Sequence, residues 1–165
     1  MQRLVILALL FSIFLVGCSQ PEEKKVLCPA ENYKLLGKDF KEPGWVVGDA
    51  DSSGFEIMFK EWKQILLTRA SCSYQGVAVK ATKDAGGFYF IYVYPSKEIA
   101  DGNLAALKKK IEEQYSTEQA GASGFRFMTP FGTFTFVRYS NAIIGAGGTD
   151  EEKVIEAVLN KIRSS

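Results

Sequence analysis

Hydrophobic positions along the chain follow two different periods, which together predict three helices and five strands. Helices are predicted where apolar residues recur every three or four positions, over residues 54–69, 97–115 and 150–163. Strands are predicted where aromatic and β-branched residues run between turn residues, over 72–82, 88–94, 125–128, 133–139 and 142–145. The predicted element order is therefore α-β-β-α-β-β-β-α.

The segment 88–94 predicts the centre of a sheet, because all seven of its residues are aromatic or β-branched. Tight turns between successive strands indicate that the sheet is mainly antiparallel, and the amphipathic helices must then cover it. We therefore expect an α+β fold in which two or three helices cover a mainly antiparallel sheet, as a two-layer or a three-layer sandwich.

Serine and threonine residues mark the expected helix starts. Ser53 lies three residues before Glu56, which is the spacing of a capping box. Thr149 and Glu152 repeat this spacing before the last helix, and Ser96 is expected to cap the middle one.

Three segments are expected to lack regular structure: residues 29–48, the small-residue loop 119–123, and a turn at 145–148. A strand over 55–59 remains an alternative to the first helix, since Gly-Phe also opens two of the predicted strands. The segment assignments are otherwise consistent with one domain of ordinary size.

The start of the chain has the composition of a secretory leader. Arg3 is basic, and of the thirteen residues 4–16 only Ser12 is polar, a run too short to span a bilayer. The run ends in Leu-Val-Gly-Cys at residues 15–18, which resembles the lipobox of bacterial lipoproteins. In that class the leader is cleaved before the cysteine, whose thiol carries a diacylglyceryl group and whose new amine is usually acylated.

The resemblance implies that residues 1–17 are a cleaved signal peptide and that Cys18 is the lipid attachment residue. Two or three acyl chains would hold the protein stably to a membrane, because each buried methylene contributes about 0.8 kcal/mol. Ser19 stands where inner-membrane lipoproteins of enteric-type bacteria often carry Asp, so the resemblance favours the outer membrane of the cell envelope where the organism has one. An ordinary cleaved leader or an uncleaved anchor remains the alternative.

The resemblance also sets the expected domain boundaries. Residues 18–30 would form the lipidated N-terminus and a short tether, disordered to about Lys25, and residues 31–165 a single α+β domain. Within that domain, the pattern F-V-R-x-x-N-x-I over 136–143 is similar to small bacterial envelope-lipoprotein domains and to PsbP/Mog1-type sandwiches. Neither likeness assigns a functional residue.

The charge balance gives no indication of a nucleic-acid partner. Without Arg3 the mature chain has nineteen basic and nineteen acidic residues, whereas a nucleic-acid binder is expected to have a basic excess. The lysines at 108–110 are followed by Glu112 and Glu113, and we interpret this stretch as a solvated helix face.

The cysteine count predicts a disulfide. With Cys18 lipidated, Cys28 and Cys72 remain as an even pair in an oxidising compartment. Such a bridge would contribute about 4 kcal/mol in the chain-entropy model. Two unpaired thiols remain the alternative.

The absence of histidine from the sequence removes the commonest general base and zinc ligand, and with them every Ser-His or Cys-His arrangement. The glycines at 145–148 lack the lysine and the third glycine of phosphate-binding loops. Acid-base chemistry would have to use carboxylates, such as Asp49 with Asp51 or Glu112 with Glu113. We therefore predict no catalytic residue and no cofactor.

Two candidate binding sites remain. Asp49, Asp51 and Ser53 have the spacing of the first calcium ligands of a calcium loop, although Lys60 stands where the loop needs Glu. The alternative is an acidic turn before a helix.

The second candidate is aromatic. One face of the central strand carries four rings, those of Phe88, Phe90, Tyr92 and Tyr94. Core packing is the default for such a face, but if it were uncovered it would suit an apolar ligand, a glycan or an envelope protein. The expected function is a non-enzymatic, lipid-anchored binding or accessory domain of the envelope, and the alternative is a carboxylate-dependent hydrolase acting on envelope material.

Overall fold

The computed structural model describes residues 23–50, 52–82 and 86–165, with only the backbone described for 52–58. Seven strands form one antiparallel sheet in the order β1-β2-β3-β7-β6-β5-β4. The strands are β1 (Trp45–Asp49), β2 (Cys72–Lys80), β3 (Gly86–Val93), β4 (Thr117–Gln119), β5 (Gly124–Thr129), β6 (Gly132–Tyr139) and β7 (Ala142–Gly148). The helices are α2 (Ser52–Leu67), α3 (Lys97–Glu112) and α4 (Glu151–Ser164), with short 3-10 turns η1 (Ala30–Tyr33) and η2 (Gly37–Asp39).

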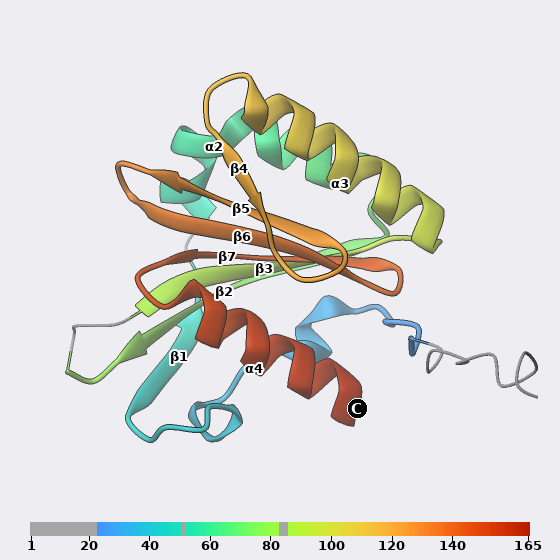
Figure 1. Cartoon of the computed structure of the whole chain (residues 1–165). Helices are drawn as coiled ribbons and strands as arrows, with labels where there is room; N and C mark the ends of the chain where they lie inside the picture. The colour runs from blue at the N-terminus through green and yellow to red at the C-terminus, as the bar shows by residue number, and fades with distance from the viewer. Residues whose placement is uncertain (1–22, 51, 83–85) are drawn as a thin grey trace, which may run out of the picture.

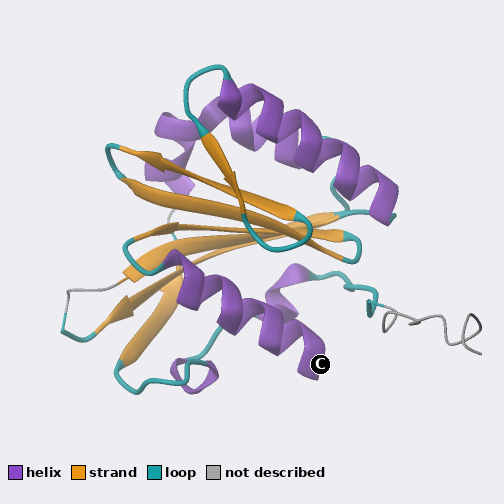
Figure 2. Ribbon diagram, viewed as in Figure 1, coloured by secondary structure: helices purple, strands orange, loops and turns teal. Residues whose placement is uncertain are grey.

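The molecule has three layers, as Figures 1 and 2 show. Helices α2 and α3 lie together on one face of the sheet, and α4 lies on the other face beside the N-terminal segment. This confirms the α+β class and the mainly antiparallel sheet, and it selects the three-layer form of the prediction. Strand β3 lies between β2 and β7, inside the sheet as expected.

Two edge strands were missed. Strand β1 overlaps the end of the segment predicted to be irregular, and β4 overlaps the start of the predicted loop. Each pairs with one neighbour only, β1 with β2 and β4 with β5. Edge strands of five and three residues carry too few positions for alternation to be recognised.

The segment 145–148 belongs to strand β7, so the prediction of a flexible turn there was wrong. The lack of a side chain at Gly145 and Gly147 makes room for aromatic rings of neighbouring strands. A Cβ added at Gly145 would collide with the ring of Phe90 from β3, and one at Gly147 would lie 2.6 Å from the Phe134 ring from β6. These glycines therefore serve packing between strands.

The helix caps are only partly as predicted. The Ser96 hydroxyl accepts a hydrogen bond from the Ile99 amide at 3.4 Å, which confirms the cap of α3. The capping box proposed for α4 is absent, because the Thr149 hydroxyl accepts from the Gly86 amide of β3 at 3.1 Å instead. Helix α2 begins at Ser52, one residue before the predicted cap Ser53, and its presence excludes the alternative strand.

Candidate functional site

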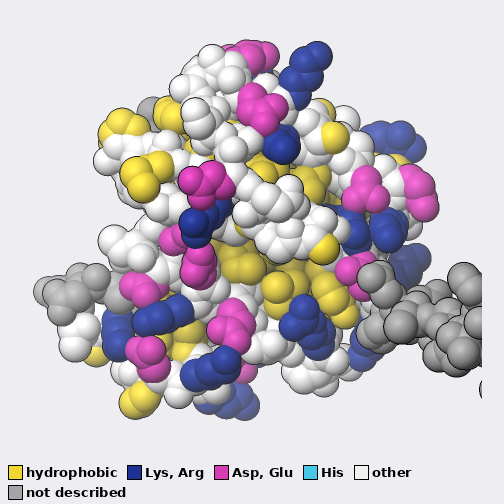
Figure 3. Space-filling model, viewed as in Figure 1, with side chains coloured by type: hydrophobic (Ala, Val, Ile, Leu, Met, Phe, Trp, Pro, Cys, Tyr) yellow, Lys and Arg dark blue, Asp and Glu magenta, His cyan; other side chains and the backbone are white. Residues whose placement is uncertain are grey.

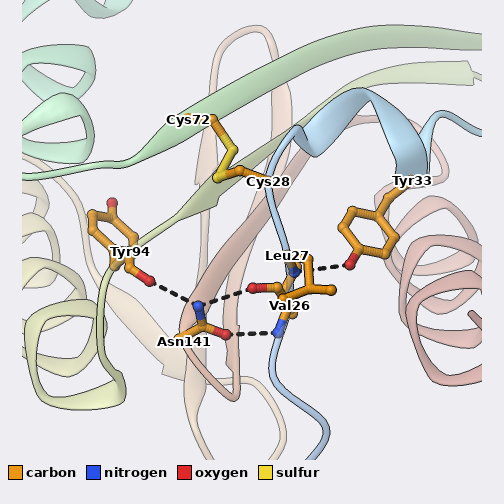
Figure 4. The surroundings of a disulfide bond; sticks show 7 residues. All are labelled: Val26, Leu27, Cys28, Tyr33, Cys72, Tyr94 and Asn141. Atoms are coloured by element: carbon orange, nitrogen blue, oxygen red, sulfur yellow. Dashed lines mark hydrogen bonds between the residues drawn. A yellow bond between two sulfur atoms is a disulfide. The ribbon is translucent and has the colours of Figure 1, made fainter.

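A disulfide between Cys28 and Cys72 ties the N-terminal segment to the first residue of β2, as predicted. The two Cα atoms are 6.0 Å apart. Figure 4 shows the bridge beside the segment that runs towards η1. The N-terminal segment is thereby fixed to the sheet at one covalent point.

The side chain of Asn141 holds the same segment by hydrogen bonds (Figure 4). Its Oδ1 accepts from the Val26 amide at 2.7 Å, and its Nδ2 donates to the Val26 carbonyl at 3.1 Å and to the Tyr94 carbonyl at 2.7 Å. Asn141 lies in the β6–β7 turn and is only 3% exposed. The side-chain amide of Asn141 thus makes the two hydrogen bonds with the Val26 backbone that a residue of a neighbouring strand would make.

A third attachment is made by the first described residue, Glu23. The Glu23 carboxylate accepts from the Arg138 guanidinium at 2.5 Å and from the Ser140 amide at 2.8 Å. Burial alone would raise the pKa of Glu23, but these hydrogen bonds outweigh it and lower the pKa below its usual value. The carboxylate is therefore held in its ionised form.

Arg138 is the centre of this cluster and has a side chain only 7% exposed. Besides Glu23, its Nε lies 2.7 Å from an oxygen of Asp101 on α3, and its Nη2 donates to the Ser123 hydroxyl at 2.9 Å. The guanidinium thus links β6, α3, the β4–β5 loop and the N-terminal segment.

These contacts correct the expected domain boundary. Val26 and Ala30 are 1% and 0% exposed and belong to the core under α4. Residues 23–30 are therefore part of the folded domain, and the expected disorder does not extend to Lys25. Cys18 and the leader lie outside the described residues.

A groove of about 1130 Å³ opens beside this N-terminal attachment. Its lining includes four basic side chains and two hydroxyls, those of Lys25, Lys97, Arg138, Arg163, Ser96 and Ser123. The Arg163 guanidinium lies 5.6 Å from the centre of the Tyr139 ring, also in the lining. In Figure 3, dark-blue side chains gather at the right-hand edge of the domain, where the described chain begins in Figure 1.

The predicted aromatic binding face is closed. Phe90, Tyr92 and Tyr94 are at most 1% exposed, and the half-buried Phe88 packs against the same cluster under α2 and α3. The Tyr94 hydroxyl donates to the Leu66 carbonyl of α2 at 2.6 Å, and burial raises the pKa of Tyr92 to about 12. The ligand-binding interpretation was wrong, and core packing is what these rings do.

The calcium interpretation finds no support. Asp49 ends strand β1, where one of its oxygens accepts from the Lys34 ammonium and from the Tyr74 hydroxyl, each at 2.7 Å. These hydrogen bonds lower the pKa of Asp49. Asp51 lies outside the described residues, and Ser53 belongs to helix α2. Within the described ranges, no three acidic, histidine or cysteine side chains are placed to share a metal ion.

The carboxylates considered for acid-base chemistry belong to surface ion pairs. Glu113 contacts Lys110 at 2.8 Å, and Glu112 lies 3.7 Å from Lys108, which confirms a solvated face on α3. Sequence reasoning missed Glu151 at the start of α4, which is 6% exposed and whose pKa is raised by burial. The signal was weak, since acidic residues are common in a first helical turn.

Arg138 was also missed as the residue that holds the N-terminal segment, since nothing in the sequence relates it to Glu23, 115 residues away. No helix in the described part of the chain is long and apolar enough to cross a membrane. Comparison with protein-family models, curated proteins and solved structures found no match to this chain.

Proposed function

We propose that this protein is a lipid-anchored component of the bacterial cell envelope whose domain acts as a non-enzymatic binding or accessory module. The Cys28–Cys72 disulfide carries the proposal. Disulfides persist in oxidising compartments outside the cytosol. The bridge also uses two of the three cysteines in the sequence, which leaves Cys18, at the end of Leu-Val-Gly-Cys, as the one available for acylation.

The attachment of the N-terminal segment supports the same proposal. Three successive contacts, at Glu23, Val26 and Cys28, fix the segment that would lead to the anchor. From Cys18 to Glu23 the chain can extend no more than about 18 Å. A lipid on Cys18 would thus keep the domain at the membrane surface.

The hydrolase alternative has less support. A carboxylate-dependent hydrolase needs two neighbouring acids whose environments separate their pKa values. Glu151 has a raised pKa, but the neighbouring acid, Glu152, is the next residue of α4, and consecutive helix residues do not face each other. The pair that this chemistry requires is not formed there.

Metabolic labelling tests the proposal. Cells expressing the protein are grown with an alkynyl fatty acid, and the purified protein is coupled to a fluorescent azide. The native chain should carry the label, and mass spectrometry should find a mature N-terminus at residue 18. The Cys18→Ser variant should carry none, whereas Cys28→Ser/Cys72→Ser should keep it. An unlabelled native chain would overturn the proposal.

A further inference from the structure

The groove beside the N-terminal attachment has positive charge that the domain does not neutralise. Arg138 at its base is paired with Glu23 and Asp101. Within the described ranges, the other three cations of the lining form no ion pair: Lys25, Lys97 and Arg163, all exposed.

Elsewhere on the domain, paired cations are common. Lys153 contacts both Glu42 and Asp150 at 3.2 Å, and Lys161 contacts Asp39 at 2.7 Å. At the groove, the acids near the cations are already engaged. Glu98 interacts with the Ser96 hydroxyl, which lowers its pKa, and Glu23 and Asp101 hold Arg138. Glu23 and Glu98 also attract Lys97, but without forming an ion pair with it. The unpaired lysine and arginine groups can therefore accept an external anion.

The position of the groove indicates the source of that anion. Glu23 is itself part of the lining, and it lies five residues from Cys18. Five residues of extended chain span about 18 Å at most, so an acylated Cys18 would hold the groove within that distance of the lipid headgroups. Attraction between exposed charges acts over about 8 Å at physiological ionic strength. A domain tethered this closely can bring its exposed cations within that distance of the headgroups.

Resting on the proposed function, we propose that this groove is the membrane-facing surface of the domain and binds the phosphate groups of anionic phospholipids. Arginine and lysine side chains are the usual protein ligands of phosphate. Three unpaired cations along an open groove can also contact the headgroups of several anionic lipids at once. The anchor would supply attachment, and the groove would set the orientation of the domain on the bilayer.

Hydrogen–deuterium exchange on the acylated, full mature protein tests this orientation. The protein is reconstituted into vesicles of phosphatidylcholine alone, or of phosphatidylcholine with phosphatidylglycerol. On the anionic vesicles, exchange should slow several-fold in segments 94–98, 120–124, 138–142 and 161–165. The slowing should disappear in salt of about 1 M, where the screening length falls to about 3 Å.

Matched variants identify the groups responsible. Lys25→Gln/Lys97→Gln/Arg163→Gln should lose the difference between the two vesicles. Lys38→Gln/Lys60→Gln/Lys109→Gln removes the same charge from exposed lysines elsewhere and should keep it. All variants should have unchanged far-ultraviolet circular dichroism, because the substituted side chains are exposed. If both triple variants lost the difference in exchange between the two vesicles equally, the assignment of headgroup binding to the groove would be overturned.

The remaining outcomes separate this inference from the proposed function. Glycerol phosphate added to phosphatidylcholine vesicles should leave exchange unchanged. Slowing there equal to that on anionic vesicles would overturn the membrane source in favour of a free phosphate ligand. Protein retained on both vesicles with identical exchange would overturn the groove alone. Protein that washes off both in high salt would overturn the lipid anchor.

Discussion

The two faces of the sheet are packed by different means. Under α2 and α3 the core is aromatic, with rings that contact one another across several elements: Phe59, Trp62, Phe90, Phe125, Phe127, Phe134 and Phe136. Under α4 the core is mostly aliphatic, and it is completed by Val26, Ala30 and Leu35 from a segment with little regular structure.

The two faces of the sheet are therefore covered in two different ways. The aromatic face is closed by helices, whose large side chains bury enough area to hold them in place. The α4 face depends on a segment that has no helical or strand period of its own. A disulfide, one asparagine and one ion pair to the sheet hold that segment, all formed between residues far apart in the sequence.

The largest effect is expected on the aromatic face. Phe134 is 1% exposed, and its ring lies 5.0 Å from Phe59 and 5.5 Å from Phe127 between ring centres. Phe134→Ala should lower the free energy of unfolding by about 3–5 kcal/mol through lost burial and a cavity. Phe131→Ala, at a position 67% exposed, should change it by less than about 0.5 kcal/mol. Denaturant titration measures the free energy of unfolding of both variants. Similar losses in the two would contradict a stabilising role for the aromatic core around Phe134.

On the α4 face, removal of the covalent link should have the next largest effect. Cys28→Ser/Cys72→Ser should lower the free energy of unfolding by about 2–4 kcal/mol. Reducing the native protein should give the same loss. Hydrogen exchange should quicken over 23–30 and change little over 104–111 in α3. Uniform acceleration across both faces would show that the N-terminal segment does not open separately from the rest of the domain.

A smaller loss is expected from Asn141→Ala. The substitution leaves the Val26 amide and two carbonyls buried without partners, at a cost of about 1–3 kcal/mol. Asn160→Ala, at an exposed position on α4, is the control and should be nearly neutral. Combining Asn141→Ala with the cysteine variant should give a loss smaller than the sum, because both act on the same segment. Strict additivity would argue against that shared role.

The smallest effect concerns Glu151. Burial raises the pKa of Glu151 in the folded state, so folding favours its protonated form. The contribution of Glu151 to the free energy of unfolding is therefore fully present below its unfolded-state pKa. That contribution is lost as pH rises through its folded-state pKa. Glu151→Gln should therefore stabilise the protein at pH 7 by less than about 1 kcal/mol. The gain should vanish near pH 4, as thermal unfolding across pH would show. A gain independent of pH would contradict the burial of a charge.

The sequence was sufficient where a pattern is local and strong. The helical periods of α3 and α4, the aromatic run of β3 and the cysteine pair all predicted what the structure contains. Edge strands β1 and β4 were missed because each has few residues and one partner. Thr149 was misassigned because a contact with β3 replaced a local cap.

The candidate site could not be predicted in the same way. The contact of Val26 with Asn141 joins residues 115 positions apart, and no local period encodes it. Whether the rings of Phe90 and Tyr92 were covered depended on where α2 and α3 pack, which is a tertiary property. The groove likewise forms from residues of α3, β6, α4 and loops that the fold brings together.

The disulfide also determines how the domain would respond to mechanical tension. A pull on the N-terminus passes through Cys28 directly into Cys72, at the start of β2. The polypeptide between these cysteines, which includes β1 and α2, is shielded from that force by the covalent shortcut. Stretching the oxidised protein from its N-terminus would therefore leave this loop unextended, and reduction would release its length.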